Sequence, residues 1–292
     1  MEVYEILNIN DLPKLDTSSL TIGNFDGVHI GHRNLIEATK IDGYKTMVIS
    51  FENINKGNYN LTNKEQKIEY LRQLDVDYLL IFPFEVVKNV FYNEFMKVLK
   101  KLNVKYITCG TNFRFGYKRE GDIIDLKKKF KVTIFDDYFV EEEKVSTSLI
   151  KEYLMKGDID KVNILLEKPY KIVGEVISGS KIGRKLGFPT ANIDYKEYLL
   201  PKNGVYFTIA KYQDKNYLSM TNVGFNPTLN EQSKKRLEVH ILDFDQEIYG
   251  ETLELSFIKY LRDEKKYDSK EELINSLNET ISICREYQDM IK

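Results

Sequence analysis

The chain has 292 residues, of which 42% are hydrophobic and 30% charged, and its formal net charge at pH 7 is −2. This length predicts two domains, and the composition is that of a globular protein. The charge balance gives no reason to expect a nucleic-acid or membrane partner, and no apolar stretch approaches the roughly 20 residues that cross a bilayer. Two widely separated cysteines, Cys109 and Cys284, and a polar N-terminus without a signal-peptide pattern predict a cytoplasmic protein.

The first half of the chain alternates strand-like and helix-like segments joined by short connections. Strands are expected at 20–23, 46–51, 78–82, 106–109 and 132–135, and helices at 32–40, 63–74, 92–102 and 123–130. A capping box, Thr62-x-x-Glu65, should open the second helix. The lysine run 127–129 is interpreted as a solvated helix face. This alternation predicts a doubly wound α/β domain, with a parallel sheet between two layers of helices.

The second half changes in texture at Pro169, after two further predicted helices at 146–156 and 159–166. Short strands are expected at 172–177, 204–212, 217–223, 237–244 and 252–261, separated by Gly, Pro and Asn. That spacing predicts an antiparallel barrel or sandwich. A terminal amphipathic helix over 269–290 should begin at the capping box Ser269-x-x-Glu272. The domain boundary is therefore expected near residues 158–169.

A glycine-rich segment, Gly23-Asn24-Phe25-Asp26-Gly27-Val28-His29-Ile30-Gly31-His32, follows the first strand and opens a helix. Free N–H groups at a helix start attract anions, and glycines let a phosphate approach the backbone closely. Since they are three residues apart, His29 and His32 share one side of the helix start and are candidates for donating to phosphate oxygens. The alternative is a pair of histidines used for capping and packing. A metal site here lacks a third nearby ligand.

The pattern G-x-F-D-G-x-H-x-G-H resembles the signature of the nucleotidylyltransferase superfamily, in the form found in the adenylyltransferase half of bacterial FAD synthetases. Two later segments resemble that family's second and third motifs: Gly110–Gly116 followed by Arg119-x-Gly121-Asp122, and Val145-Ser146-Thr147-Ser148-Leu149-Ile150-Lys151. The resemblance implies His29 and His32 as catalytic residues. It implies that ATP and its phosphates are bound by Gly23, Phe25, Asp26, Gly31, Asn112, Arg114, Ser146, Thr147 and Lys151.

Two features depart from this family. Lys151 stands where the family usually has an arginine, so the charge is kept but the planar two-pronged fork is lost. The family also often has a Pro-His-Pro loop after the second strand, whereas residues 50–57 contain neither residue type. Without the resemblance, Ser146 would be interpreted as a helix cap, and Arg114 and Arg119 as solvated surface charges.

A second glycine-rich, basic segment spans 179–192 and ends in Pro-Thr-Ala-Asn. Its glycines allow a loop to fold over phosphates, and Lys181 and Arg184 supply positive charge. Thr190 and Asn192 offer oxygen ligands of the kind that Mg²⁺ prefers. From this chemistry alone, the alternative is a flexible basic loop.

This segment resembles the G-x-x-x-G-R-x-L-G-F-P-T-A-N motif of riboflavin kinases, and later segments such as 201–206, 222–228, 238–244 and 261–264 agree with it. The resemblance implies Glu238 as the base that takes the proton of the ribityl 5′-hydroxyl, with Mg²⁺ held by Thr190 and Asn192. It implies phosphate contacts from Gly179, Lys181, Gly183 and Arg184, and flavin contacts from Gly187, Phe188, Pro189 and Arg262. Without it, Glu238 would be an outward residue of an alternating strand, and His240 on the same face is interpreted as structural.

Together the resemblances imply a nucleotidylyltransferase domain over 1–158, a linker helix over 159–167 and a riboflavin-kinase barrel over 168–292. The implied enzyme phosphorylates riboflavin to FMN with Mg-ATP, then adenylylates FMN to FAD with release of pyrophosphate. Its expected partners are riboflavin, FMN and ATP, and it is expected to be a monomer or weak homo-oligomer. Two alternatives stay open: a riboflavin kinase with a weakened first domain, and a flavin-binding regulator without turnover.

Overall fold

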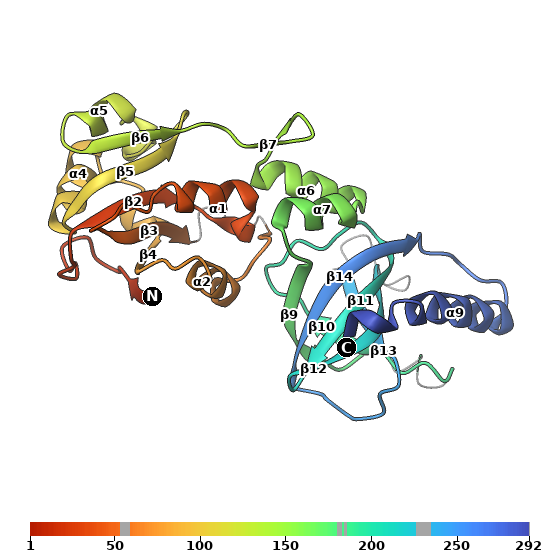
Figure 1. Ribbon diagram of the computed structural model, residues 1–292. Helices are drawn as coiled ribbons and strands as arrows, with labels where there is room; N and C mark the ends of the chain where they lie inside the picture. Colours follow the sequence, from red (N-terminus) through yellow and green to blue (C-terminus); the bar gives the residue numbers. More distant parts are fainter. Residues whose placement is uncertain (53–58, 180–182, 184–185, 226–234, 292) are drawn as a thin grey trace. The chain divides into compact units, whose positions relative to one another are not determined.

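The computed structural model describes residues 1–52, 59–179, 183, 186–225 and 235–291. The chain forms two compact units, Met1–Thr147 and Ser148–Lys292, which Figure 1 shows in sequence colours. This division falls at the start of the first of the two helices that precede the barrel. The functional boundaries at 158 and 168 are drawn from sequence and stay a prediction.

A six-stranded sheet with the order β1-β4-β3-β2-β5-β6 forms the centre of the first unit. Its strands are β1 (Glu2–Glu5), β2 (Ser18–Gly23), β3 (Lys45–Glu52), β4 (Tyr78–Pro83), β5 (Val104–Gly110) and β6 (Lys131–Phe135). All neighbouring strands are parallel. The chain leaves β2 for β3 on one side and later adds β5 on the other side, so the strand order reverses at β2. Ligands of such sheets bind beyond the carboxyl ends of the strands at this reversal.

Helices pack on both faces of this sheet (Figure 1). Val48 belongs to the core shared with α1 (Ile30–Glu37) and α2 (Lys64–Arg72). Its neighbour Met47 faces the opposite core, which contains Phe95 of α4 (Tyr92–Lys101). The remaining elements are η1 (Asp26–Val28), α3 (Phe84–Val87), η2 (Tyr117–Arg119), α5 (Ile123–Lys127), β7 (Phe139–Val140) and β8 (Glu143–Lys144). The predicted doubly wound α/β domain is confirmed.

The second unit is built on a closed barrel with the strand order β10-β13-β12-β11-β14-β9. Its strands are β9 (Tyr170–Ile177), β10 (Ala191–Asp194), β11 (Gly204–Tyr212), β12 (Lys215–Gly224), β13 (Arg236–Ile241) and β14 (Thr252–Arg262). All neighbouring strands of the barrel are antiparallel. Buried hydroxyls link adjacent strands, because Thr208 Oγ1 lies 2.7 Å from the hydroxyl oxygens of both Ser219 and Thr221. The predicted antiparallel barrel is confirmed.

Helices α6 (Thr147–Lys156), α7 (Ile159–Leu166) and α9 (Lys270–Arg285), with η3 (Gln288–Ile291), accompany the barrel. Helix α9 covers the outer barrel face, where its Cys284 packs with Phe207 and Met220. Asn163 attaches α7 to two strands: its Nδ2 donates to the Phe257 carbonyl at 3.0 Å and its Oδ1 accepts from Tyr170 N–H at 2.8 Å.

The predicted capping box at the start of α2 is displaced by one residue. Asn63 is the cap, since its Oδ1 accepts from Gln66 N–H at 2.8 Å and Gln66 Oε1 accepts from Asn63 N–H at 3.3 Å. Thr62, the predicted cap, instead accepts from Gly27 N–H at 3.1 Å. The prediction was wrong because the Thr62 hydroxyl serves a turn far away in the sequence.

The terminal helix begins as predicted, with Ser269 Oγ accepting from Glu272 N–H at 3.1 Å. The reciprocal bond goes to a different donor, because Glu272 Oε2 accepts from Asp268 N–H at 3.3 Å. The α-helix ends at Arg285, earlier than the predicted end at 290. Strands β1, β7, β8 and β10 and helix α3 were not predicted.

The Asn163 side chain yields a stability prediction. Asn163→Ala removes both bonds between α7 and the barrel, and we expect the free energy of unfolding to fall by about 1–2 kcal/mol. The matched control is Ile164→Ala, at the adjacent exposed position. We expect it to change the free energy of unfolding by less than about 0.5 kcal/mol. Urea unfolding followed by circular dichroism measures both. Equal midpoints for the two variants would show that the bridge is not stabilising.

Candidate active sites

The turn after β2 has an unusual backbone. Phe25, Gly27 and Val28 have φ values of 52°, 80° and 42°. Positive φ is strained for a β-branched residue such as Val28, and such strain persists only where the surroundings fix the backbone. All three residues are buried, and Phe25 and Val28 pack in the core beneath α1 and α2. The fold therefore holds this turn in one shape at the carboxyl end of β2.

The Asp26 carboxylate anchors this turn. Asp26 is 2% exposed, and its Oδ1 accepts from the N–H groups of Leu61 at 2.8 Å and Thr62 at 3.1 Å. The Thr62 hydroxyl lies 3.3 Å from the same oxygen and accepts from Gly27 N–H. This carboxylate, predicted to bind ATP, thus connects the turn to the segment that precedes α2.

His29 and His32 stack on each other, with ring centroids 3.6 Å apart and 16° between planes. His29 is the cap of α1, because its Nδ1 accepts from His32 N–H at 3.3 Å. A neutral imidazole that accepts at Nδ1 carries its proton on Nε2, which is then a donor. A Cβ at Gly31 would lie 3.3 Å from the His29 ring, so only glycine fits comfortably there. Capping and phosphate donation are therefore compatible roles for His29.

A buried lysine lies behind the same turn. Lys67 of α2 is 8% exposed, and its Nζ donates to Ser50 Oγ at 3.3 Å. The Ser50 hydroxyl in turn donates to the Asn24 carbonyl at 3.1 Å. Sequence analysis did not identify this lysine, because a lysine in a charged amphipathic helix is usually solvated.

A cavity of about 360 Å³ lies at the carboxyl ends of the strands. Five phenylalanines from four separate segments form much of its wall: Phe51, Phe84, Phe95, Phe113 and Phe115. Four cations also line it: Lys88, Arg114, Lys118 and Arg119. Flat aromatic ligands pack well against such side chains, and the cations suit an attached phosphate. Only the two arginines were identified from sequence, because the phenylalanines come together only in the fold.

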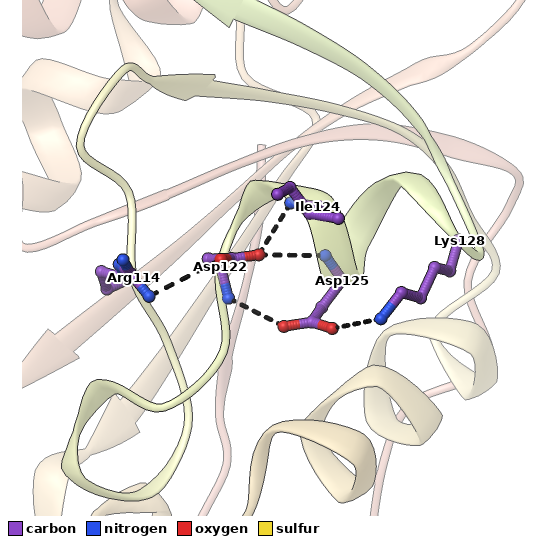
Figure 2. A network of polar contacts seen from close by, with 5 residues as sticks. All are labelled: Arg114, Asp122, Ile124, Asp125 and Lys128. Carbon is purple, nitrogen blue, oxygen red and sulfur yellow. Dashed lines mark hydrogen bonds and ion pairs between the residues drawn. The ribbon is translucent and has the colours of Figure 1, made fainter.

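Arg114 is oriented by the cap of α5, as Figure 2 shows. Its Nη1 lies 3.7 Å from Asp122 Oδ2. Asp122 Oδ1 accepts from the N–H groups of Ile124 at 2.8 Å and Asp125 at 3.2 Å. Lys128 donates to Asp125 at 2.7 Å and thereby lowers the pKa of that carboxyl. The guanidinium is 49% exposed, so it remains accessible to a ligand.

The remaining predicted residues of the first constellation lie at element ends. Gly23 ends β2, and Asn112 is exposed on the loop after β5. Ser146 directly precedes α6, which Thr147 opens, and Lys151 follows one turn later. These positions are compatible with anion binding and with simple capping, so their roles stay a prediction.

In the barrel, Glu238 lies in a polar row that crosses three strands. The β13 residue Glu238 is paired with Asn192 of β10 and with Asn222 of β12. Directly paired side chains share one face, with Cβ atoms about 5 Å apart. Arg236 Nη1 lies 3.4 Å from Glu238 Oε1, and Asn222 Nδ2 donates to Glu264 at 3.2 Å. Glu238 is thus an outward residue, but its neighbours are polar and fixed by strand register.

Two glycines pack tightly against this row. A Cβ at Gly179 would lie 2.0 Å from Asn192 Nδ2, and one at Gly183 would lie 2.3 Å from the Phe188 carbonyl oxygen. Gly183 also lies beside Thr190, whose Oγ1 would be 3.3 Å from that Cβ. Close approach of the backbone to Thr190 and Asn192 therefore requires glycine at both positions. Lys181 and Arg184, predicted to bind phosphate, lie outside the described residues.

Three of the predicted flavin residues lie together. Gly187, Phe188 and Pro189 line one cavity of about 700 Å³, which also includes His240 and Arg285 of α9. His240 Nδ1 lies 2.8 Å from the Pro189 carbonyl oxygen, so the ring donates a proton to it. This bond attaches the Pro-Thr-Ala-Asn segment to β13 and supports the structural interpretation of His240.

The fourth predicted flavin residue is directed elsewhere. Arg262 Nε donates to Thr280 Oγ1 at 3.3 Å, which connects the end of β14 to α9. A second cavity of about 250 Å³ also includes Pro189 in its lining, and Thr190, Val239 and Tyr249 contribute to its wall. The barrel therefore offers two concave surfaces that meet at the Pro-Thr-Ala-Asn segment.

No helix among the described residues is long and apolar enough to cross a membrane.

Family models match both halves of the chain: one described as FAD synthetase matches residues 12–149, and one described as riboflavin kinase matches residues 166–288. Each matched range contains one of the two glycine-rich segments, 23–32 and 179–192.

Curated relatives match nearly the whole chain. A "Bifunctional riboflavin kinase/FMN adenylyltransferase" of Buchnera aphidicola subsp. Schizaphis graminum is 35% identical and covers 98% of this chain and 99% of that protein. Proteins described in the same words from Listeria monocytogenes and Escherichia coli K12 are 36% and 31% identical, covering 88% and 98% of this chain and 88% and 97% of their own lengths. A crystal structure described as a macrolide-efflux protein from Streptococcus pneumoniae has a TM-score of 0.87 at 28% identity, covering 97% of this chain and 98% of that one.

His240 yields a pH prediction. Burial lowers its pKa below the usual 6.5, against the opposing effect of the Pro189 carbonyl. Because the folded pKa is depressed, the unfolded chain binds a proton first, and stability is lost as the pH falls below about 6.5. We expect the barrel to unfold at lower urea concentration at pH 5.5 than at pH 7.5. His240→Gln keeps a donor for Pro189 and should reduce this difference, so an undiminished difference would contradict the assignment.

Proposed function

The chain belongs to the bifunctional riboflavin kinase/FMN adenylyltransferase family, and from this premise we propose that each unit carries one of the two active sites. The first unit adenylylates FMN at the turn after β2. The second unit phosphorylates riboflavin beside the Asn192–Glu238–Asn222 row. The observation that carries the proposal is that the histidine pair lies at the reversal of the sheet in the first unit, whereas Glu238 and its two asparagines lie across paired barrel strands in the second.

In the proposed adenylylation, an FMN phosphate oxygen attacks the α-phosphorus of ATP. The bond from that phosphorus to the bridging oxygen breaks, and pyrophosphate leaves with the electron pair. His29 Nε2–H and the His32 ring donate to phosphate oxygens on which charge builds up. The stacked geometry of the rings, with centroids 3.6 Å apart, supports their action as one fixed donor pair.

The phenylalanine-lined cavity is proposed to bind the isoalloxazine ring of FMN. Its lining includes Phe51, Phe84, Phe95, Phe113 and Phe115, and its volume is about 360 Å³. Arg114 lines the same cavity and is proposed to bind the phosphate of FMN or ATP. This assignment gives the first unit a flavin site that the sequence had not predicted.

In the proposed kinase reaction, Glu238 accepts the proton of the ribityl 5′-hydroxyl as that oxygen bonds to the γ-phosphorus. The bond to the ADP oxygen breaks, so no covalent enzyme intermediate forms. Asn222 lies across from Glu238 and is itself fixed by Glu264, which supports a role in orienting the hydroxyl. The cavity of about 700 Å³ beside Phe188 is proposed to receive the flavin.

Mg²⁺ fits the donor set beside this row. Thr190 and Asn192 supply neutral oxygens. Because Gly179 and Gly183 have no side chain, the backbone at these positions can lie close to both residues. These two residues would hold the ion, which supplies charge neutralisation to the triphosphate when bound.

The proposal includes a cytoplasmic location, supported by two free, buried cysteines, Cys109 and Cys284. It includes a monomer or weak homo-oligomer. The kinase-only alternative is favoured by two features of the sequence, the lysine at position 151 in place of the family's arginine and the absence of the Pro-His-Pro pattern from residues 50–57. A regulator without turnover is opposed by the fixed row around Glu238.

Reciprocal variants test the division of activities. His29→Asn keeps a good helix cap while it removes the imidazole, and we expect FAD formation from FMN and Mg-ATP to fall by about 10²–10³-fold. Riboflavin phosphorylation should stay unchanged. Glu238→Gln should do the opposite and lower FMN formation by about 10²–10⁴-fold. Chromatography of the flavins measures both rates.

Two outcomes would count against the proposal. If the unaltered protein makes FMN but no FAD, the kinase-only alternative holds. If both variants keep both rates, the assigned residues are not catalytic, whatever the family membership.

Gly31 gives a finer test of the histidine pair. Gly31→Ala places a methyl group 3.3 Å from the His29 ring, so the ring must shift, and we expect FAD formation to fall by about tenfold. The matched control is Glu37→Ala at the exposed end of the same helix, which should leave the rate unchanged. Riboflavin phosphorylation by both variants serves as the internal reference. An unchanged rate of FAD formation in Gly31→Ala would show that the ring position is not important.

A further inference from the structure

A basic concavity lies at the amino-terminal edge of the sheet in the first unit. It has a volume of about 650 Å³ and is lined by five lysines, Lys100, Lys105, Lys127, Lys129 and Lys131, with Tyr44, Val104, Tyr106 and Phe130. All five lysines are exposed. They come from α4, β5, β6 and the end of α5, so the fold gathers charges that the sequence disperses. No acidic residue contributes to the lining.

These five lysines contrast with Lys128, which lies between two of them in the sequence. Within the described residues, none of the five makes an ion pair, whereas the adjacent Lys128 pairs with Asp125 at 2.7 Å and lies outside the lining. Helix ends account for Lys100 and Lys127, because cations stabilise helix carboxyl termini. They do not account for Lys105 and Lys131, which lie on strands. In a chain of net charge −2, five unpaired positive charges around one concavity are unexpected.

The concavity is separate from the adenylylation site. Lys105 and Tyr106 lie near the start of β5, whereas Gly110, beside the proposed active site, ends that strand. The seven residues of β5 place the two edges of the sheet roughly 20 Å apart. The lysines therefore cannot contact a nucleotide bound at the turn after β2.

The lining favours a compact, highly charged anion over a nucleic acid. The Tyr106 ring has Lys131 Nζ 4.9 Å from its centroid and the Tyr44 ring at 4.8 Å in an edge-on arrangement, so both tyrosines already contact neighbours within the concavity. Proteins that bind single strands without sequence preference depend on the stacking of bases on aromatic side chains. All the cations are lysines, which act as point charges and lack the planar fork of arginine. Charge density is therefore the property that the concavity can recognise.

We propose that this concavity binds an inorganic polyphosphate-type anion, in which several phosphates follow one another without a base or sugar. Lys105 and Lys131 contact one part of the chain of phosphates, and Lys127 and Lys129 contact the next. Lys131 Nζ also donates to Tyr106 OH at 3.0 Å, which fixes its position at the edge of the site.

Lysine footprinting on the full-length protein tests this proposal. The protein is acetylated briefly with and without inorganic tripolyphosphate, at equal ionic strength set with sodium chloride, and each lysine is quantified by mass spectrometry. We expect acetylation of Lys105, Lys127, Lys129 and Lys131 to slow by about tenfold, because unpaired ammonium groups become covered by the anion. Lys128 is the internal reference and should change by less than about twofold.

Variants complete the test. Lys127→Gln/Lys129→Gln should abolish the protection of Lys105 and Lys131, whereas Lys128→Gln should leave it intact. Equal protection of Lys128 and its neighbours would indicate diffuse screening and overturn the proposal. Protection by a short oligothymidylate but not by tripolyphosphate would also overturn it, in favour of a nucleic-acid surface. Neither readout uses the flavin reactions, so the result is independent of the proposed function.

Discussion

The first site depends on the anchoring of one turn. Left to itself, a backbone with Val28 in the left-handed region is strained, and the histidines that follow would have no fixed position. The buried Asp26 carboxylate removes this freedom by accepting two N–H groups from the segment before α2. In the same segment, the Thr62 hydroxyl accepts a hydrogen bond from Gly27 N–H. The histidine pair is therefore held by a contact between residues more than thirty positions apart in the sequence, and its donors need no rearrangement when charge develops.

In the barrel, strand register holds the functional residues in position. Glu238 is an outward-facing residue, and an isolated carboxylate on such a surface would be solvated. Antiparallel pairing places Asn192 on one side of it and Asn222 on the other. The glycines at 179 and 183 then allow the loop backbone to lie against Thr190 and Asn192 without a side chain between them. His240 fixes the same segment from the neighbouring position on β13 through the Pro189 carbonyl. The position of the second site is thus set by the register of the barrel strands.

Much of the fold could be predicted from sequence, because its signals are local. The alternation of strands and helices with short connections predicted the parallel sheet, and the turn-rich second half predicted the barrel. Short elements such as β1 and β10 lack that periodicity and were missed. The histidine pair and Glu238 were found by motif, whereas Lys67 and the phenylalanine cavity were not, since only the folded chain brings those residues together. The capping box at Thr62 failed for the same reason, as a distant turn uses its hydroxyl.

The central claim is that each unit contains its own triphosphate site. A crystal structure of the full-length protein with a non-hydrolysable ATP analogue and Mg²⁺ tests it most directly. The account predicts two bound analogues per chain, one with phosphates against His29 and His32, and one with phosphates beside Thr190 and Asn192. Analogue bound at only one of these places, or only elsewhere on the chain, would contradict it.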